Sequence, residues 1–581
     1  MERFVEATRT SRALRGTPVR LRETLNRFRR EEDGSLIVFG LFCFVTMLFV
    51  AGFALDMMRY ESERAILQNT MDRALLAAAD IDQQLDSEAV VRDYFDRAGF
   101  DGSEVNAVGT HSGGMKTVTA DAATRMDTFL LHLVDIPVLY APAGGTAQEG
   151  NGNVEISLVV DVSTSMTWCL DGSRTCATNS TAGDTRIEAL REAAALFVKT
   201  VFRAEWEKVT DPSQPSQLID HLKPTVGPEQ ISVSLVPYAQ QVNLGPVLGP
   251  EFSFSNEHNE SWCADFKEID YAYTGIAPND PLRRTLNADA RNSGRTPSYR
   301  ECSTDASRYV VPMSNDPDYL TKRVMALPAT GLGGSDTAYT SIDIGAKWGA
   351  AFLDPTLQPV TSSLVSKGVV PAALATRPEA FRSRMGRKLL VLMTDGENTN
   401  TFAVNPPYRS GPAPNTVVGK NGKIYIYRPE RDGSNDFYGE SSSRTSLDWR
   451  SIADIGGSYR EATYADVYAN HTVEYYFSRM YRAAMGGNDL TGAAITEFGT
   501  AQKDVQLDSI CAAAKNAGVF VWTIALGLSG ADMATEPRSN WSPLQKCASV
   551  PAMYFEPKTA EELKEAFEEI AAAASELRLT Q

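Results

Sequence analysis

A long apolar run lies near the amino terminus of the chain. Residues 35–55 read SLIVFGLFCFVTMLFVAGFAL and include no charged side chain. A helix of this length, rising about 1.5 Å per residue, spans a hydrocarbon core of about 30 Å. We therefore predict one transmembrane helix. A cleaved secretory signal is the alternative, but this run exceeds the usual apolar region of a signal, and no small-residue cleavage pattern follows at once.

A helical pattern continues beyond the apolar run. Apolar residues recur there every three to four positions, at Leu67, Met71, Leu75 and Ala78. We predict a transmembrane helix with a helical extension over 34–82, either as a stalk that faces a partner or as a helix packed on its own domain. Weaker strand and helix signals predict a small α+β subdomain over 83–150. Its Gly/Ala-rich end, 141–153, is predicted to be a linker.

Strands alternate with helices from residue 151 to residue 578. The predicted strands are short and apolar, at 154–160, 231–236, 388–393 and 519–526. This pattern predicts an α/β fold with a doubly wound, mostly parallel sheet covered on both faces. Two insertions interrupt it, at about 205–330 and 400–490. The second holds ten of the chain's 21 tyrosines, which predicts either an adaptable contact surface or an insertion packed on itself.

The distribution of charge changes this picture in two ways. The formal net charge is -17, with 73 acidic and 56 basic residues, which argues against a nucleic-acid partner. Residues 1–30 nevertheless carry nine arginines and no lysine. Because positive charge beside a membrane-spanning helix stays in the cytoplasm, we predict a cytoplasmic Arg-rich tail over 1–33 and the rest of the chain outside. A solvated tail without this role is the alternative.

The cysteines agree with this orientation. Cys43 lies in the apolar run, which leaves six of the seven cysteines in an extracytoplasmic, oxidising compartment. The sequence cannot select among the possible connectivities. Proximity along the chain suggests the pairs Cys169–Cys176, Cys263–Cys302 and Cys511–Cys547. With five histidines, no HExxH motif and no zinc-finger spacing, the sequence argues against a zinc enzyme.

Carboxylate and hydroxyl side chains follow two of the predicted strands. Asp161, Ser163 and Ser165 alternate at the end of the first strand, and Asp395 follows strand 388–393. Open α/β sheets bind their ligands at the carboxyl ends of the strands. Hard oxygen donors suit Mg²⁺ or a similar divalent cation. We therefore predict a cation site, although an ordinary Asp/Ser turn is the alternative for the first motif alone.

A glycine-rich loop, 331–345, lies between the two motifs and leads into a predicted helix. Together with this loop, DVSTSM and MTDGE resemble the three metal-binding loops of the von Willebrand factor A family. The resemblance implies Thr340 as a further ligand, because it stands five residues before Gly345, as the family's threonine does before its helix glycine. Ser335 and Thr337 remain alternatives, since GGSDT also resembles the family's GGTxT form.

The resemblance also implies roles for these residues. Asp161 would supply charge, Asp395 would act through water, and neutral oxygens would come from Ser163, Ser165 and Thr340. The cation would keep an open position for an Asp or Glu carboxylate of a protein partner. We expect Mg²⁺, with Mn²⁺ or Ca²⁺ as alternatives, and a protein that is not an enzyme.

Several further segments resemble TadG-like proteins of the Tad (Flp) pilus-assembly machinery. These are RREEDGS, LQNTMDRALLAAA, VPYAQQVN, GAKWGAAFLDP and LQKCASVPAMYFEP. The resemblance covers nearly the whole chain except the two insertions. It implies a single-pass protein of the bacterial inner membrane whose bulk is periplasmic. Phe39 stands where processed Tad pseudopilins have glutamate, so we expect the anchor to be retained.

These expectations combine into a membrane-anchored, metal-dependent binding protein that acts in Tad pilus assembly through pilus components. One alternative is a periplasmic spacer whose metal site only stabilises the fold. Another is a metal-assisted hydrolase with Ser163 or Ser165 as nucleophile. The sequence has no GxSxG motif, and no histidine lies near these serines in sequence to act as a base.

Overall fold

The computed structural model describes residues 33–576 except 81–82, 84, 101–103, 113–114, 151–152, 171–184, 212, 214–216, 329–338, 383–385, 432, 441–445 and 528–541. Contacts divide the chain into two compact units. The first comprises residues 1–111 and 116–149, and the second comprises 112–115 and 150–581. The predicted tail 1–33 lies almost wholly outside the described residues.

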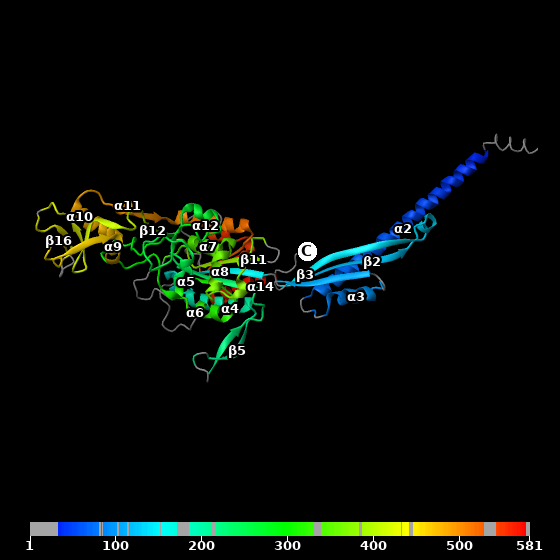
Figure 1. Cartoon of the computed structure of the whole chain (residues 1–581), viewed down its shortest axis with the longest axis horizontal. Helices are drawn as coiled ribbons and strands as arrows, with labels where there is room; N and C mark the ends of the chain where they lie inside the picture. Colours follow the sequence, from blue (N-terminus) through cyan, green and yellow to red (C-terminus); the bar gives the residue numbers. More distant parts are fainter. Residues whose placement is uncertain are drawn as a thin grey trace, which may run out of the picture. The chain divides into compact units, whose positions relative to one another are not determined.

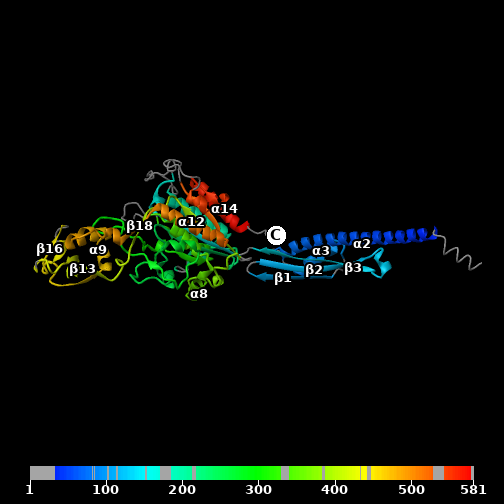
Figure 2. The ribbon, with the colours of Figure 1, turned by 90° about the horizontal axis from the view of Figure 1, so that it is seen from above.

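The first unit combines a long helix with a three-stranded sheet (Figure 1). Its elements are α2 (Asp33–Ala79), α3 (Ser87–Arg97), β1 (Glu104–Ser112), β2 (Met115–Asp127), the 3₁₀ turn η1 (Leu131–Val134) and β3 (Val138–Gly150). The strands are ordered β1-β2-β3. Helix α3 runs beside the carboxyl-terminal half of α2 (Figure 2).

The apolar stripe of α2 is buried in this unit. Leu67, Met71, Leu75 and Ala78 form one core with Val91 and Phe95 of α3 and with residues of the sheet. The extension of the helix therefore packs on its own domain, the second of the two alternatives. The amino-terminal part of α2 is exposed, and α2 is long and apolar enough to cross a membrane.

The prediction of a linker over 141–153 is wrong for most of this segment, because β3 extends to Gly150. Its glycines let α2 approach the sheet. A Cβ added to Gly145 would lie 3.1 Å from Cδ1 of Leu75. The side-chain amide of Gln68 donates to the carbonyl of Gly144 at 3.2 Å. Small residues here therefore serve a helix–sheet contact.

The second unit is built on a six-stranded sheet. Its strands are β4 (Asn153–Asp161), β7 (Ile231–Tyr238), β10 (Val311–Ser314), β11 (Gly386–Thr394), β19 (Phe520–Ala525) and β20 (Tyr554–Phe555). They are ordered β10-β7-β4-β11-β19-β20. All neighbours are parallel except β10, which is antiparallel to β7. The predicted mixed α/β fold with a mostly parallel sheet is confirmed.

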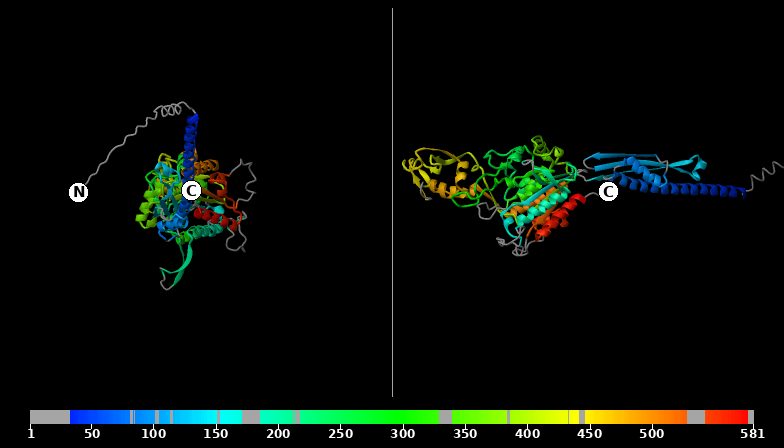
Figure 3. Two further views of the ribbon diagram at one scale, coloured as in Figure 1. Left: turned by 90° about the vertical axis from the view of Figure 1, so that its right-hand side faces the viewer. Right: turned by 90° about the horizontal axis from the view of Figure 1, so that it is seen from below.

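Helices cover both faces of this sheet. One face packs against α7 (Ile342–Ala351), α8 (Gln358–Ser366), α12 (Thr500–Ala517) and α13 (Pro543–Cys547). The other packs against α4 (Arg186–Val201), α6 (Pro317–Met325) and α14 (Ala560–Glu576). Helix α14 lies beside α4 (Figure 3), and the rings of Phe567 and Phe197 are 5.5 Å apart. All residues of β4 are buried, as expected for a central strand covered on both faces.

The first expected insertion, 205–330, is not one continuous insertion. It begins with a hairpin of β5 (Glu205–Thr210) and β6 (Leu218–Lys223), but β7, β10 and α6 belong to the main sheet and its cover. The remainder, 239–310, is mostly loops with short elements: α5 (Gly245–Leu248), η3 (Gly249–Glu251), β8 (Ala264–Asp265), η4 (Glu268–Ala272), β9 (Arg283–Arg284) and η5 (Ala306–Arg308). An insertion therefore follows β7.

The second insertion, 400–490, has its own five-stranded sheet (Figure 1). Its strands are β13 (Pro412–Gly419), β14 (Ile424–Tyr427), β15 (Phe437–Glu440), β16 (Leu447–Arg450) and β17 (Tyr459–Thr463). They are ordered β16-β15-β14-β13-β17. Three helical segments follow, α9 (Tyr464–Asn470), the π-helix η8 (Tyr475–Tyr481) and α10 (Arg482–Met485). Strands β12 (Thr401–Val404) and β18 (Ile495–Phe498) pair at its base, next to α11 (Thr491–Ala494).

Four tyrosines of this insertion are buried: Tyr425, Tyr464, Tyr468 and Tyr476. The insertion shares a core with Leu286, Ala288 and Ala290 of the loops after β7. Much of the tyrosine content therefore serves packing, the second of the two alternatives.

Two predicted disulfides are confirmed, Cys263–Cys302 and Cys511–Cys547. Cys169 is also disulfide-bonded, while its expected partner, Cys176, lies outside the described residues. Cys43 is a free cysteine on α2.

Candidate functional site

The candidate site lies where the sheet of the second unit changes its direction of winding. The strands along the sheet are third, second, first, fourth, fifth and sixth in chain order, so the direction reverses between β4 and β11. Asp161 is the last residue of β4, and Asp395 directly follows β11. Because β4 and β11 are parallel neighbours, both carboxylates emerge at the carboxyl edge of the sheet, where open α/β sheets bind ligands.

A short hydrogen-bond chain connects the predicted residues. The Ser163 backbone N–H donates to Oδ1 of Asp161 at 2.7 Å. The hydroxyl oxygens of Ser163 and Ser165 are 3.0 Å apart, and Ser165 Oγ donates to Oδ1 of Asp395 at 2.8 Å. Ser165 lies in the 3₁₀ turn η2 (Thr164–Thr167), and Ser163 directly precedes this turn. Asp161, Ser163, Ser165 and Asp395 thus form one cluster.

Thr340 is buried just before α7 but is not hydrogen-bonded to this cluster. Its backbone N–H donates to Oγ1 of Thr399 at 2.9 Å, and its carbonyl accepts from Nζ of Lys503 at 3.2 Å. The two alternatives, Ser335 and Thr337, lie outside the described residues. The assignment of the threonine ligand therefore stays a prediction.

The cluster includes two further residues, Arg186 and Thr394, which the sequence analysis did not single out. Nη1 of Arg186 lies 2.9 Å from Oδ2 of Asp395, and both side chains are buried. The Thr394 hydroxyl donates to Oδ2 of Asp161 at 2.7 Å. Arg186 begins α4, far from Asp395 in sequence, so local spacing carries no signal for it. Thr394 could have been predicted from its position beside Asp395 at the end of a buried strand.

The two carboxylates carry a charge that the protein only partly offsets. Burial, followed by the charge of Asp395, raises the pKa of Asp161 to about 7. Burial also raises the pKa of Asp395, although the Arg186 guanidinium and the Ser165 hydroxyl oppose this effect. The cluster therefore favours an additional positive charge, such as a proton or a metal cation.

The donor set fits a hard divalent cation. Carboxylate and hydroxyl oxygens are the ligands of Mg²⁺ and its relatives, which retain several waters when protein ligands are few. Within the described parts of the chain, no three His, Cys, Asp or Glu side chains converge in a way that could hold a metal. A cation here would therefore depend on serine hydroxyls and water beside Asp161 and Asp395.

In the metal-free protein, we expect Asp161→Asn to flatten the dependence of stability on pH. The ordinary pKa of an aspartate carboxyl is 3.8, and the pKa of Asp161 is about 7 in the folded protein. Between these pH values the folded state holds a proton that the unfolded state has lost, so stability falls as pH rises and the loss is complete above the folded-state pKa. The variant should avoid this loss, which is on the order of a few kcal/mol at alkaline pH.

Urea unfolding of both proteins in EDTA, from acidic to mildly alkaline pH, measures the difference. Ser157→Ala is the matched control, because Ser157 is buried on the same strand and its hydroxyl has no hydrogen-bond partner among the residues that the structure describes. Parallel pH profiles for wild type and Asp161→Asn would contradict the assigned charge state.

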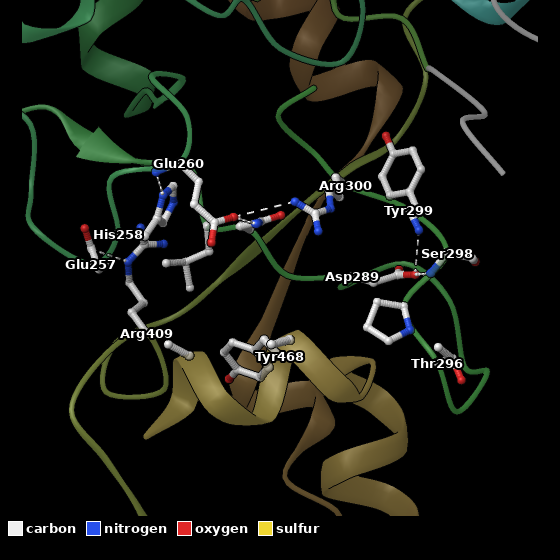
Figure 4. Close-up of a pocket in the computed structure, with 15 residues that line it drawn as sticks. Glu257, His258, Glu260, Asp289, Thr296, Ser298, Tyr299, Arg300, Arg409 and Tyr468 are labelled. Carbon is white, nitrogen blue, oxygen red and sulfur yellow. Dashed lines mark hydrogen bonds and ion pairs between the residues drawn. The ribbon is translucent and has the colours of Figure 1, made fainter. Parts of the chain in front are cut away.

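A separate cavity of about 320 Å³ lies between the two insertions. Figure 4 shows His258 and Arg409 on one side of it and Ser298 on the other. Arg409 Nε donates to Oε1 of Glu257 at 3.1 Å. Asp289 accepts hydrogen bonds from four residues, Arg291, Asn292, Ser298 and Tyr299. The pair of Arg409 and Glu257 therefore joins the two insertions, whereas Asp289 fixes the loop to which it belongs.

One protein family matches part of the chain. Residues 34–80, which correspond to α2, match the family described as putative Flp pilus-assembly TadE/G-like proteins. The segment that is apolar enough to span a membrane thus links the chain to Tad pilus assembly. No curated protein matches the chain.

Some solved structures align with much of the chain at low similarity. The PilB minor pilin from Streptococcus sanguinis is 12% identical, with 82% of this chain and 78% of that chain covered and a TM-score of 0.27. The open pilus adhesin SpaC from Lactobacillus rhamnosus GG is 12% identical, with coverages of 82% and 34% and a TM-score of 0.25. Proximal thread matrix protein 1 from the mussel byssus is 10% identical, with coverages of 73% and 46% and a TM-score of 0.23. Such low scores do not establish a shared fold.

Proposed function

We propose that the chain is a membrane-anchored, metal-dependent protein-binding component of Tad (Flp) pilus assembly, and that its second unit is a von Willebrand factor A domain. The observation that carries this proposal is the cluster of Asp161, Ser163, Ser165 and Asp395 at the switch point between β4 and β11. The strand order and the antiparallel edge strand β10 support the domain assignment.

The cluster would work by presenting an electrophilic cation to a partner. Bound Mg²⁺ would supply a positively charged coordination position for a carboxylate of the partner. Asp161 would hold the cation through charge, and Ser163 and Ser165 through neutral oxygens. Arg186 offsets part of the charge of Asp395, which leaves less negative charge to weaken the attraction for an external Asp or Glu.

The match of α2 to the TadE/G-like family supports the cellular setting. Helix α2 would cross the bacterial inner membrane once, with the arginine-rich amino terminus in the cytoplasm and both folded units in the periplasm. The disulfides Cys263–Cys302 and Cys511–Cys547 agree with an oxidising compartment. The partner would then be another component of the pilus-assembly apparatus that offers an acidic side chain.

Partner capture by the full chain, solubilised from the cell membrane, tests this proposal. We expect pilus-assembly proteins to co-purify in Mg²⁺, to be lost in EDTA and to return when Mg²⁺ is added back. Asp161→Asn should abolish capture, whereas Ser157→Ala should leave it unchanged. If every partner survives both chelation and Asp161→Asn, metal-bridged recognition is wrong.

A second candidate function is a periplasmic spacer whose cluster only stabilises the fold. The buried ion pair between Arg186 and Asp395 favours it, because this pair already gives Asp395 a cationic partner. Under this alternative, EDTA would lower the melting temperature while partner capture persisted. Measuring both quantities on the same samples separates the two candidates.

A further inference from the structure

The turn between β2 and β3 is fastened to the long helix of the first unit. The carboxylate of Asp56, on α2, accepts hydrogen bonds from the backbone N–H groups of Phe129, Leu130 and Leu131, each at 2.8 Å. The Asp56 side chain is fully buried by these contacts. Three charge-assisted hydrogen bonds to one carboxylate fix the turn at one height along the helix.

A second contact places the turn beside the apolar run itself. A Cβ added to Gly52 would lie 2.2 Å from Cδ1 of Leu130, so the turn rests directly on the helix backbone there. Gly52 lies within the apolar run 35–55, and Asp56 is the first charged residue after it. The turn therefore meets α2 at the boundary between its apolar and polar parts.

The turn exposes an unusual number of large apolar side chains. Phe129 is 62% exposed and Leu133 is 61% exposed, and Val134 and Ile136 are exposed as well. His132 and Asp135 lie among them and are also exposed. A mixture of apolar and polar side chains is typical of segments that lie in the headgroup region of a bilayer, where water still reaches polar groups.

We propose that residues 128–137 form a second membrane contact, which inserts its apolar side chains into the bilayer interface beside α2. This rests on the proposed crossing of the membrane by α2. Lipid is the occupant that the geometry favours, because the exposed apolar surface of the turn continues that of α2, where Phe53 and Leu55 are exposed at the same height. Attachment at two points would restrict how the first unit tilts on the membrane surface.

Site-directed spin labelling of the full chain in phospholipid vesicles tests the proposal. The background variant is Cys43→Ala, which removes the free cysteine and keeps the disulfides. Single cysteines for the nitroxide are introduced by Leu133→Cys in the turn, Val45→Cys in the apolar run and Val108→Cys on β1. Val108 is the matched control, since it is an apolar residue of the same unit that is 65% exposed.

Power saturation then compares collisions with oxygen, which concentrates in lipid, and with a water-soluble nickel chelate. We expect the oxygen-to-nickel ratio at position 133 to exceed that at position 108 severalfold and to approach that at position 45. A water-like ratio at 133 with a lipid-like ratio at 45 would overturn the turn contact and leave the anchor standing. Low accessibility to both reagents at 133 would indicate protein cover and would also overturn it. A water-like ratio at 45 would refute the anchor, and the turn contact with it.

Discussion

Asp161→Ala should abolish binding of Mg²⁺ to the full chain, measured by isothermal titration calorimetry on protein freed of metal with EDTA. Asp161 is fully buried at the end of β4, and its carboxylate is the anionic ligand expected to contact the cation directly. Without it, one buried carboxylate remains, Asp395, which is already paired with Arg186. Hydroxyl oxygens alone hold a hard divalent cation weakly.

Two further variants sharpen this test. Ser157→Ala should bind Mg²⁺ as the wild type does, because Ser157 is buried on the same strand and its hydroxyl has no hydrogen-bond partner in the described part of the chain. Thr340→Ala should weaken binding if Thr340 is the threonine ligand and should leave it unchanged if another residue of the loop takes this role. Mg²⁺ affinity equal to wild type in folded Asp161→Ala would refute the cation site.

Glu155→Ala should cost the second unit about 3–5 kcal/mol of stability, the usual cost of leaving buried charges without a partner. Glu155 is buried at the start of β4. Its carboxylate accepts from Nη1 of Arg377 at 3.2 Å, from Nζ of Lys388, and from the backbone N–H of Glu379 at 2.7 Å. Arg377 and Lys388 are themselves buried. Removing Glu155 takes away the carboxylate that pairs with Lys388 and leaves Arg377 only its longer ion pair with Glu379, at 3.7 Å.

Urea unfolding followed by tryptophan fluorescence measures this cost. The matched control is Glu207→Ala, since Glu207 lies on β5 and forms a more exposed ion pair with Lys223 at 3.3 Å. Its loss should cost about 0–1 kcal/mol, because solvent screens exposed pairs. Equal losses of stability in the two variants would show that the buried ion pairs of Glu155 contribute no more to stability than the exposed pair of Glu207.

The alternation of strands and helices was predictable because burial dictates it. Strands β4 and β7 are buried on both faces. Both are rich in apolar residues, although serines interrupt the pattern, Ser157 in β4 and Ser232 and Ser234 in β7. Strand β3 was missed because its Gly/Ala-rich sequence is shaped by the approach of α2, as Gly145 against Leu75 illustrates. Such a contact between distant segments leaves only small residues in the sequence, which also mark linkers.

The candidate site was predictable to the extent that its residues stand at the ends of strands. Asp161, Ser163 and Ser165 are close in sequence, and parallel pairing of β4 with β11 brings Asp395 to them. Arg186 could not be predicted in this way, because its approach to Asp395 depends on how α4 packs across the sheet. Ligation of a cation by these residues stays a prediction.

The common core of the two insertions bears on how this protein could have evolved. Tyr476 and Phe477 pack in one cluster with Leu286 and Ala288, which come from the loops after β7. A descendant that lost residues 400–490 alone would expose this apolar surface to water, and the exposed surface would promote aggregation. We therefore expect natural relatives to carry both insertions or neither, so that their presence covaries across lineages.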